Sequence, residues 1–251
     1  MKVELITYTP NPDDVCGRAA KTCTNAGGVP EKGEVKTLKG ALSSGHESVA
    51  EHASFTFAIE GVSRALSHQL VRHRMASYSQ QSQRYVNMEG FDYVSPKSIE
   101  SSNKTVTYMV YDDETEGFNV KSIGICNAYD KIMHDIAFLY REMVEAGIPE
   151  EDARYILPNA CCTNIVVTMN ARELRHFFKL RCCERAQWEI RELANKMLAR
   201  CKEVAPVLFE KAGASCVATG KCPEGKRSCG KVKKGQERSK RVGLTFRRVK
   251  E

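Results

Sequence analysis

Hydrophobic and polar residues follow two different periods along this chain, and each period indicates a type of element. Residues 54–60 alternate strictly, which places Phe55 and Ile59 on one side and predicts a half-buried strand. Two further β-branched, apolar runs, residues 2–9 and 161–168, also predict strands. We therefore expect a sheet built from segments that are far apart in the sequence.

Other segments repeat their apolar residues every three or four positions, as amphipathic helices do. The longest such pattern covers residues 118–146. Another starts at Asn170, with Glu173 at the third helical position as in a capping box, and its apolar face ends at Arg181. Between residues 85 and 116 the chain has little periodicity beyond a short strand at 91–94. The patterns predict helices at residues 12–24, 34–44, 62–72, 118–146, 170–181 and 187–211, with a short one before Pro158.

These elements predict an α+β fold in which an antiparallel sheet packs with long helices. The length of 251 residues permits a sizeable core in one large domain. Residues 221–251 carry 12 Lys and Arg against 3 acidic residues, a charge of +9, whereas the first 220 carry 26 against 28, or −2. We therefore expect a single main domain at residues 1–212 and a basic, flexible tail at residues 213–251.

Composition indicates the cellular compartment and the class of protein. No run approaches 18 apolar residues and the first residues form a strand pattern, so neither a membrane span nor a signal peptide is expected. Eleven cysteines without a secretion signal indicate reduced thiols in the cytoplasm. Cys216, Cys222 and Cys229 are separated by five and six residues rather than paired as C-x-x-C, so we predict no metal site. Contact with an acidic surface is the favoured role for the tail.

The stretch with the clearest chemistry is residues 61–88, which contain no Asp or Glu in 28 positions. Arg64, Arg72, Arg74 and Arg84 stand in this window, and each guanidinium offers a planar fork of donors that suits phosphate or carboxylate oxygens. With no acidic residue between them, these arginines need an anion from elsewhere. A solvated basic loop is the alternative, but two apolar segments precede the loop, so we favour an anion-binding site.

Residues 72–85 read R-H-R-x-x-S-x-x-x-x-S-x-R-Y, and this pattern resembles the signature of the flavin-dependent thymidylate synthases. The resemblance covers roughly residues 2–209. Beyond the motif it rests on GHESVAEH at 45–52, ARYILP at 153–158, NAREL at 170–174, KLR at 179–181 and AQWEI at 186–190.

The resemblance implies an enzyme that converts dUMP to dTMP by reductive methylation. Methylenetetrahydrofolate is the carbon donor in that family, NADPH is the reductant, and FAD carries the hydride. Such enzymes are homotetramers whose sites lie at subunit interfaces. The expected partners are therefore dUMP, methylenetetrahydrofolate and further copies of this chain, without membrane or nucleic acid.

Carried over position by position, the resemblance also implies which residues hold the cofactor. The family often has Asn-Glu where this chain has Ser79-Gln80, and Asn where it has His176. The residues expected to bind FAD are His46, Ser48, Glu51, Arg72, His73, Arg74, Gln80, Asn170, Arg172 and His176.

A second set, partly shared with the first, is expected to hold the substrate. Arg181 and Ser82 are the two that the resemblance marks as catalytic, and Arg181 would place a cation near the pyrimidine carbonyls. From residue chemistry alone, Arg181 could instead extend to solvent with its stem buried. The residues expected to bind dUMP are Gln69, Arg72, Gln80, Gln81, Ser82, Gln83, Arg84, Arg154 and Arg181.

Two rival functions come from other classes. A non-catalytic nucleic-acid-binding protein is suggested by the basic loop and tail, but the main body is slightly acidic and the loop lacks aromatic stacking platforms. A thiol redox or metal protein is suggested by the pairs Cys161-Cys162 and Cys182-Cys183. Adjacent cysteines do not readily bridge each other, so we expect no cysteine to act as a nucleophile.

Overall fold

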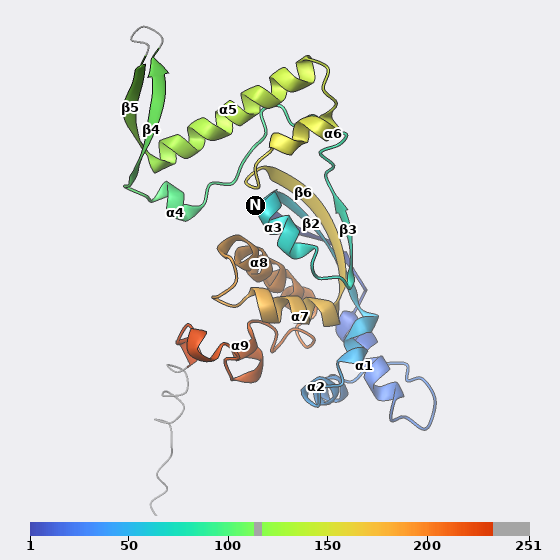
Figure 1. Ribbon diagram of the computed structural model, residues 1–251. Helices are drawn as coiled ribbons and strands as arrows, with labels where there is room; N and C mark the ends of the chain where they lie inside the picture. The colour runs from blue at the N-terminus through green and yellow to red at the C-terminus, as the bar shows by residue number, and fades with distance from the viewer. Residues whose placement is uncertain (113–116, 233–251) are drawn as a thin grey trace, which may run out of the picture. The chain divides into compact units, whose positions relative to one another are not determined.

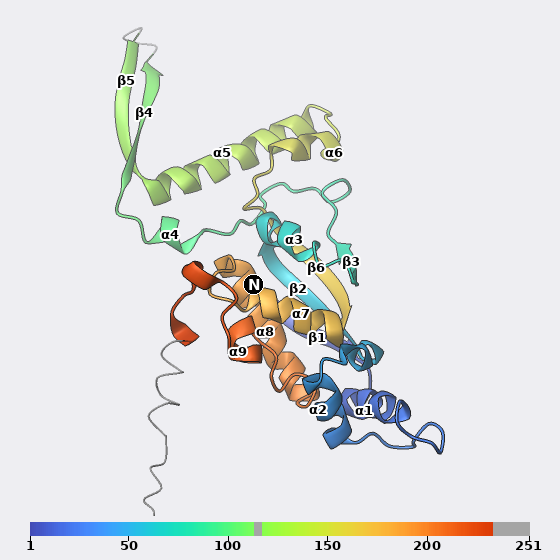
Figure 2. The same cartoon turned by 60° about the horizontal axis from the view of Figure 1, so that its bottom comes forward.

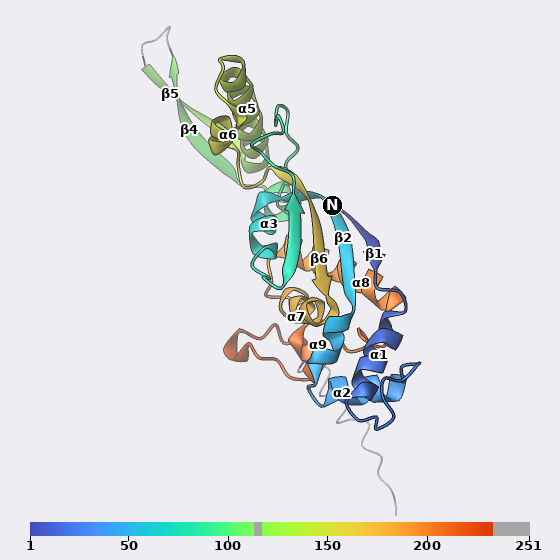
Figure 3. The same ribbon diagram turned by 90° about the vertical axis from the view of Figure 1, so that its right-hand side faces the viewer.

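A computed structural model describes residues 1–112 and 117–232 (Figure 1). Its main sheet has four strands in the order β1-β2-β6-β3, and neighbouring strands run in opposite directions (Figure 3). The predicted α+β class with an antiparallel sheet is therefore confirmed. The strands span β1 Lys2–Tyr8, β2 Ser54–Ser63, β3 Ala76–Gln80 and β6 Cys162–Asn170.

Strand β3 lies inside the motif that the sequence suggested to be a loop, and that expectation was wrong. Its five residues, ASYSQ, alternate between exposed and partly buried positions. The alternation is invisible in the hydropathy pattern because the inward residues Ala76, Tyr78 and Gln80 are small or polar. The extended backbone fixes which side chains of the motif share a face.

The residues cluster into two compact units, and several strands contribute to both. Unit 1 comprises residues 1–2, 59–72 and 78–166, and unit 2 comprises residues 3–58, 73–77 and 167 onward. The motif 72–85 therefore supplies residues to each unit. The predicted boundary at residue 212 remains a prediction, and the part of the proposed tail beyond 232 lies outside the described residues.

Unit 1 holds a hairpin that the sequence did not predict. Strand β4 Thr105–Asp112 pairs antiparallel with β5 Gly117–Gly124, with Thr105 opposite Gly124. The predicted helix at 118–146 was therefore wrong over its first seven residues, because Gly124 ends the strand and helix α5 covers only Ile125–Glu145. Alternating Phe118 and Val120 fit both patterns over so short a run, and the flanking glycines favour the strand.

The core of unit 1 forms where α5 meets the segments on either side of it. Met88, Phe91, Met133, Tyr140 and Cys161 are buried together. The Tyr140 hydroxyl accepts a hydrogen bond of 3.3 Å from the Met88 backbone N–H. The remaining helical elements of this unit are α3 Arg64–Leu70, α4 Lys97–Glu100, α6 Glu150–Ala153 and η2 Arg154–Ile156.

Unit 2 is largely helical (Figure 2). A cluster of aromatic side chains packs in its core. The Phe209 ring lies edge-on to Phe55 at 5.4 Å and to Phe178 at 5.9 Å between centroids, and Phe178 is 5.6 Å from Phe177. In the described part of the chain, no helix is long and apolar enough to cross a membrane. The elements of this unit are α1 Pro12–Thr22, α2 Val35–Ser43, η1 Glu47–His52, α7 Ala171–Arg181, α8 Trp188–Val204, α9 Ser215–Thr219 and η3 Gly225–Arg227.

Candidate active site

Helix α7 begins as its sequence predicts. The Asn170 side-chain oxygen accepts a hydrogen bond of 2.9 Å from the Glu173 backbone N–H, which caps the first turn. The Ala171 N–H donates to the Ala53 carbonyl at 2.8 Å, so the helix start is joined to the end of η1. The cap fixes the direction of the helix, and with it the positions of Arg172, Glu173 and Arg181.

His73 of the motif lies between two charged residues of that helix. Its Nδ1 is 3.2 Å from a carboxylate oxygen of Glu173, and Arg181 donates from Nε to His73 Nε2 at 3.1 Å. Because the guanidinium always carries its protons, His73 Nε2 must be the acceptor and Nδ1 must carry the proton. His73 is therefore the neutral Nδ1–H tautomer, which donates to Glu173 on one side and accepts from Arg181 on the other.

The electrostatics agree with that assignment. His73 is only 5% exposed, and burial, followed by the neighbouring charge of Arg181 and then His176, lowers its pKa from 6.5 to about 4. Burial also raises the pKa of Glu173, against an opposing effect of His176. The ring of Phe177 packs edge-on against His73 at 4.9 Å, which excludes water from this side. A fixed, uncharged imidazole thus orients Arg181 near neutral pH.

A second set of contacts joins η1 to α7. Arg172 forms an ion pair with Glu51, and Arg175 forms a longer one of 3.5 Å with Glu47. Glu51 and Arg172, both expected on the cofactor side, are therefore brought together. His46 and Ser48 lie exposed on the same segment. The structure thus groups His46, Ser48, Glu51, His73, Asn170 and Arg172 around the start of α7.

A cavity of about 330 Å³ opens beside this group. Gly45, Glu47, Arg175 and His176 contribute to its lining, together with Lys179. The Arg175 Nη1 donates to the Leu208 carbonyl at 2.6 Å, but its buried Nε has no hydrogen-bond partner in the described part of the chain. The guanidinium thus links α7 to the Leu208 backbone at the edge of the cavity.

In unit 1, three predicted glutamines already have partners. Gln80 donates from Nε2 to Ser67 Oγ at 3.1 Å and to Thr163 Oγ1 at 3.2 Å, so its amide ties β3 to α3 and β6. The Gln81 side-chain oxygen accepts from Asn164 at 3.1 Å. Buried Gln83 lies 3.7 Å from the Cys161 sulfur. These contacts hold the motif backbone in place.

The arginines of the acid-free window do not all depend on an external anion. Arg84 pairs with Glu151, through Nε at 3.0 Å and Nη2 at 2.9 Å, so that part of the prediction was wrong. The counter-ion is 67 residues away in the sequence, where no local pattern could reveal it. Arg154 Nε donates to the Glu151 carbonyl at 3.0 Å and thus lies on the same turn.

Arg72 and Arg74 are exposed and form no ion pair within residues 1–112 and 117–232. Ser82 Oγ accepts from the Arg84 N–H at 3.2 Å, and Gln69 donates to the Ala65 carbonyl at 3.3 Å. Each is thereby held by its own segment. Arg72 and Arg74 are the two motif cations best placed to meet a ligand or another subunit.

Sequence reasoning missed three residues that organise the site. Glu173 was recognised only as a capping residue, although its carboxylate also contacts His73. Glu47 and Arg175 were not predicted at all, and their pairing spans 128 residues. The spacing of Glu47 and Glu51, four apart, against that of Arg172 and Arg175, three apart, was the available signal.

Several cysteine thiols are held in the protonated form by partial or full burial. Burial raises the pKa of Cys16 and of Cys182 to about 12 and that of Cys161 to about 11. The charge of Lys202, rather than that of Arg181, opposes the effect at Cys182. Thiols with such pKa values are protonated at neutral pH and are poor nucleophiles.

Comparison with known proteins provides evidence that is independent of this geometry. The sequence profile of the family described as "Thymidylate synthase complementing protein" matches residues 4–207. A flavin-dependent thymidylate synthase of Clostridium tetani is 50% identical over 246 residues, covering 92% of this chain and 94% of that protein. One from Geobacter sulfurreducens is 49% identical, covering 92% and 95%, and one from Thermococcus onnurineus is 43% identical, covering 97% and 98%.

The buried tautomer of His73 makes a prediction about acid stability. Because its folded pKa of about 4 lies below the unfolded value of 6.5, the unfolded chain binds more protons between those values. Stability should therefore fall as pH drops through this window, with His73 contributing a loss of about 2 kcal/mol between pH 7 and pH 5. His73→Gln should remove this contribution from urea unfolding curves. The control variant His134→Gln, at an exposed histidine, should keep this pH-dependent loss of stability. Equal losses of stability between pH 7 and pH 5 in both variants would contradict the assignment.

Proposed function

This chain belongs to the thymidylate synthase complementing protein family, and we propose that it makes dTMP from dUMP with FAD, methylenetetrahydrofolate and NADPH. Synthesis of dTMP and dependence on a flavin follow from the family. The folate donor and NADPH are the finer parts of the proposal. The alternative of a non-catalytic nucleic-acid-binding protein gains no support from the relatives.

The observation that carries the proposal is the ordered group at α7, in which neutral His73 orients Arg181. A guanidinium held from one side by a buried acceptor keeps its orientation. It can then interact with an oxygen on which negative charge develops during reaction. Carbonyl oxygens of a pyrimidine are such atoms.

The residues around the start of α7 fit a flavin dinucleotide. The helix N-terminus and Arg172 favour its pyrophosphate, and Arg175 lines the adjoining cavity. We assign cofactor binding to His46, Ser48, Glu51, His73, Arg74, Asn170, Arg172 and His176, with Arg72 and Gln80 from the motif. When bound, FAD supplies the hydride that reduces the transferred carbon.

We assign dUMP binding to donors of the motif and to Arg181 of α7. Arg72, Arg84 and Arg154 suit the phosphate because guanidinium forks bind it in a bidentate way. Gln69, Gln80, Gln81 and Gln83 suit the base and sugar, together with Ser82, whose hydroxyl oxygen accepts from the Arg84 backbone N–H. Arg181 favours the electron-rich form of uracil whose C5 attacks the one-carbon unit.

Assembly into a homotetramer, with sites at subunit interfaces, is part of the proposal. Helix α5 has Phe138 57% and Leu139 50% exposed, and Met109 of β4 is 71% exposed. Large apolar side chains exposed along a helix and a hairpin support contact with another copy. The free state of all eleven cysteines supports a reducing compartment such as the cytoplasm.

The proposed reaction is tested by reconstitution. We expect the full chain, loaded with FAD, to form dTMP from dUMP only when methylenetetrahydrofolate and NADPH are both supplied. The flavin absorption of the protein after desalting reports cofactor binding separately. A protein that retains no flavin and forms no dTMP would overturn the proposal.

Arg181 should affect turnover as well as binding. Arg181→Ala should raise the dUMP concentration needed for half-saturation and slow the reaction at saturating dUMP, by about 2–4 kcal/mol in the barrier. Arg181→Lys should recover only part of the rate, because an ammonium does not reproduce the fork. The surface variant Lys196→Ala serves as control, and flavin content is measured in each. An unchanged maximal rate in Arg181→Ala would leave it a binding residue only.

Disrupting the exposed face of α5 should disturb assembly. Leu139→Glu places a charge among apolar side chains, so we expect species smaller than the tetramer in light scattering after gel filtration. Val29→Glu makes the same change at an apolar residue that is 68% exposed in a loop of unit 2, and should leave assembly intact. Tetramers of normal mass for Leu139→Glu would place the interface elsewhere.

A further inference from the structure

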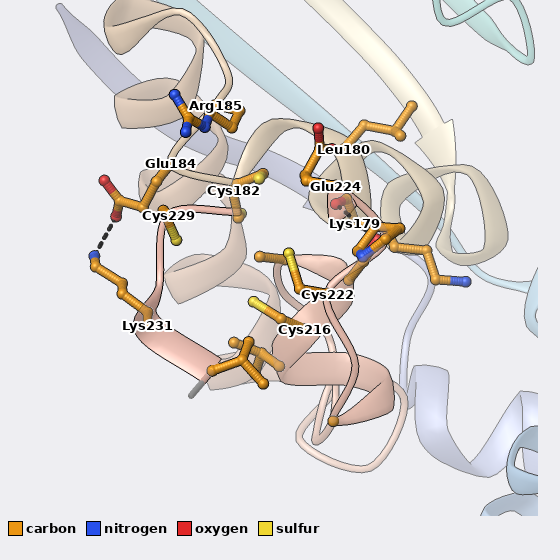
Figure 4. A pocket seen from close by; sticks show the side chains of 17 residues that line it. Lys179, Leu180, Cys182, Glu184, Arg185, Cys216, Cys222, Glu224, Cys229 and Lys231 are labelled. Carbon is orange, nitrogen blue, oxygen red and sulfur yellow. Dashed lines mark hydrogen bonds and ion pairs between the residues drawn. The ribbon is translucent and has the colours of Figure 1, made fainter. Parts of the chain in front are cut away.

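Five of the eleven cysteines line a single cavity of about 480 Å³ in unit 2. Figure 4 shows the side chains of Cys182, Cys216, Cys222 and Cys229 gathered around it. Cys183 also contributes to the lining. All five are free thiols. The proposed thymidylate synthase chemistry uses none of them, so this concentration of sulfur needs a different explanation.

The thiols come from two separate segments. Cys182 and Cys183 follow directly after α7, whereas Cys216, Cys222 and Cys229 belong to the segment 214–232 that includes α9 and η3. The family profile ends at residue 207, so the second segment follows the part that the profile matches. The cavity therefore joins an element within the profile to the segment that comes after it.

The segment 214–232 buries little of its own. Helix α9 has only five residues and none of them is fully buried, while Val217 is 67% exposed. Polar contacts attach the segment instead: Lys231 pairs with Glu184, and Arg185 donates to the Arg227 carbonyl (Figure 4 shows the first). Short segments with so little apolar burial usually depend on a cross-link for stability.

We propose that this cavity is a structural metal site in which Cys216, Cys222, Cys229 and one thiolate of the Cys182-Cys183 pair bind a Zn²⁺ ion. Zinc prefers four sulfur or nitrogen ligands in a tetrahedron and binds cysteine as the thiolate. The sequence spacing argued against a metal because it showed only three cysteines. The fourth ligand is supplied 34 residues before Cys216 by Cys182, or 33 residues before it by Cys183.

Binding requires a small closure of the segment. Within the described residues, no three His, Cys, Asp or Glu side chains already have the spacing of a metal site. Gly220 and Gly230 adopt positive φ angles of 72° and 80° and flank the loops that carry Cys222 and Cys229. Such glycine turns permit the loops to draw in without strain to side chains. The ion would replace the thiol protons of its ligands.

Nearby charges favour a metal over a reactive thiol. Lys179, Arg185 and Lys231 line the cavity along with Glu184 and Glu224, so thiolates bound to a dication have cations close by. Adjacent Cys182 and Cys183 do not readily form a disulfide with each other.

The test uses the full chain, reduced and stripped of metal by a chelator, then titrated with Zn²⁺ alone. We expect one tightly bound ion per chain by elemental analysis, and a rise in melting temperature on binding. Titration with Co²⁺ should give the intense visible bands of a tetrahedral thiolate site. These readouts need neither flavin nor dUMP, so they are independent of the proposed enzyme activity.

Matched variants assign the ligands. Cys216→Ser with Cys222→Ser should abolish the Zn²⁺ equivalent and the Co²⁺ bands, whereas Cys23→Ser with Cys126→Ser, outside the cavity, should retain both. Circular dichroism checks that each variant folds. The proposal is overturned if the reduced wild-type chain binds no Zn²⁺ or if the two double variants retain it equally. It is also overturned if a disulfide between cavity cysteines persists under the reducing conditions.

Discussion

The contact on which the site depends is the one between His73 and Arg181. A guanidinium at the end of a helix has many rotamers, and ordinarily a carboxylate would fix it. Here one partner is the unprotonated nitrogen of a buried imidazole, whose other nitrogen donates to Glu173. The imidazole therefore orients the Arg181 guanidinium through an uncharged side chain.

The residues of helix α7 make different contacts along its length. Asn170 caps its first turn, Arg172 and Arg175 pair with η1 in the turns that follow, and Arg181 is its last residue. Directly after it come Cys182 and Cys183, which line the thiol cavity. One helix thus links the ion pairs to η1, the Arg181 guanidinium and the C-terminal segment. A shift of its start would propagate to all three, which explains why both a side-chain cap and a backbone bond to Ala53 fix that start.

Much of this could be predicted from the sequence where local rules act. The cap at Asn170 and three of the strands follow from spacing alone. Strand β3 could not be predicted, because its inward residues are small or polar, and β5 could not, because seven residues fit both periods. The Arg84–Glu151 pair was inaccessible for a different reason. The acid-free window describes residues that are neighbours in the sequence. The carboxylate that compensates the charge of Arg84 is a neighbour only in space.

The arginines also differ in whether the described part of the chain supplies a counter-ion. Arg84 pairs with Glu151 within unit 1, and Arg172 pairs with Glu51 within unit 2, so a ligand anion would have to share these guanidinium groups with a carboxylate. Arg72 and Arg74 flank buried His73 and remain exposed, without ion pairs in the described part of the chain. Exposed guanidinium groups are hydrated and cost the fold little, so both remain available to an anion such as a dinucleotide pyrophosphate or a nucleotide phosphate. The motif therefore combines one anchored residue with two unneutralised ones, which is the arrangement expected of a site selected for anions rather than for stability.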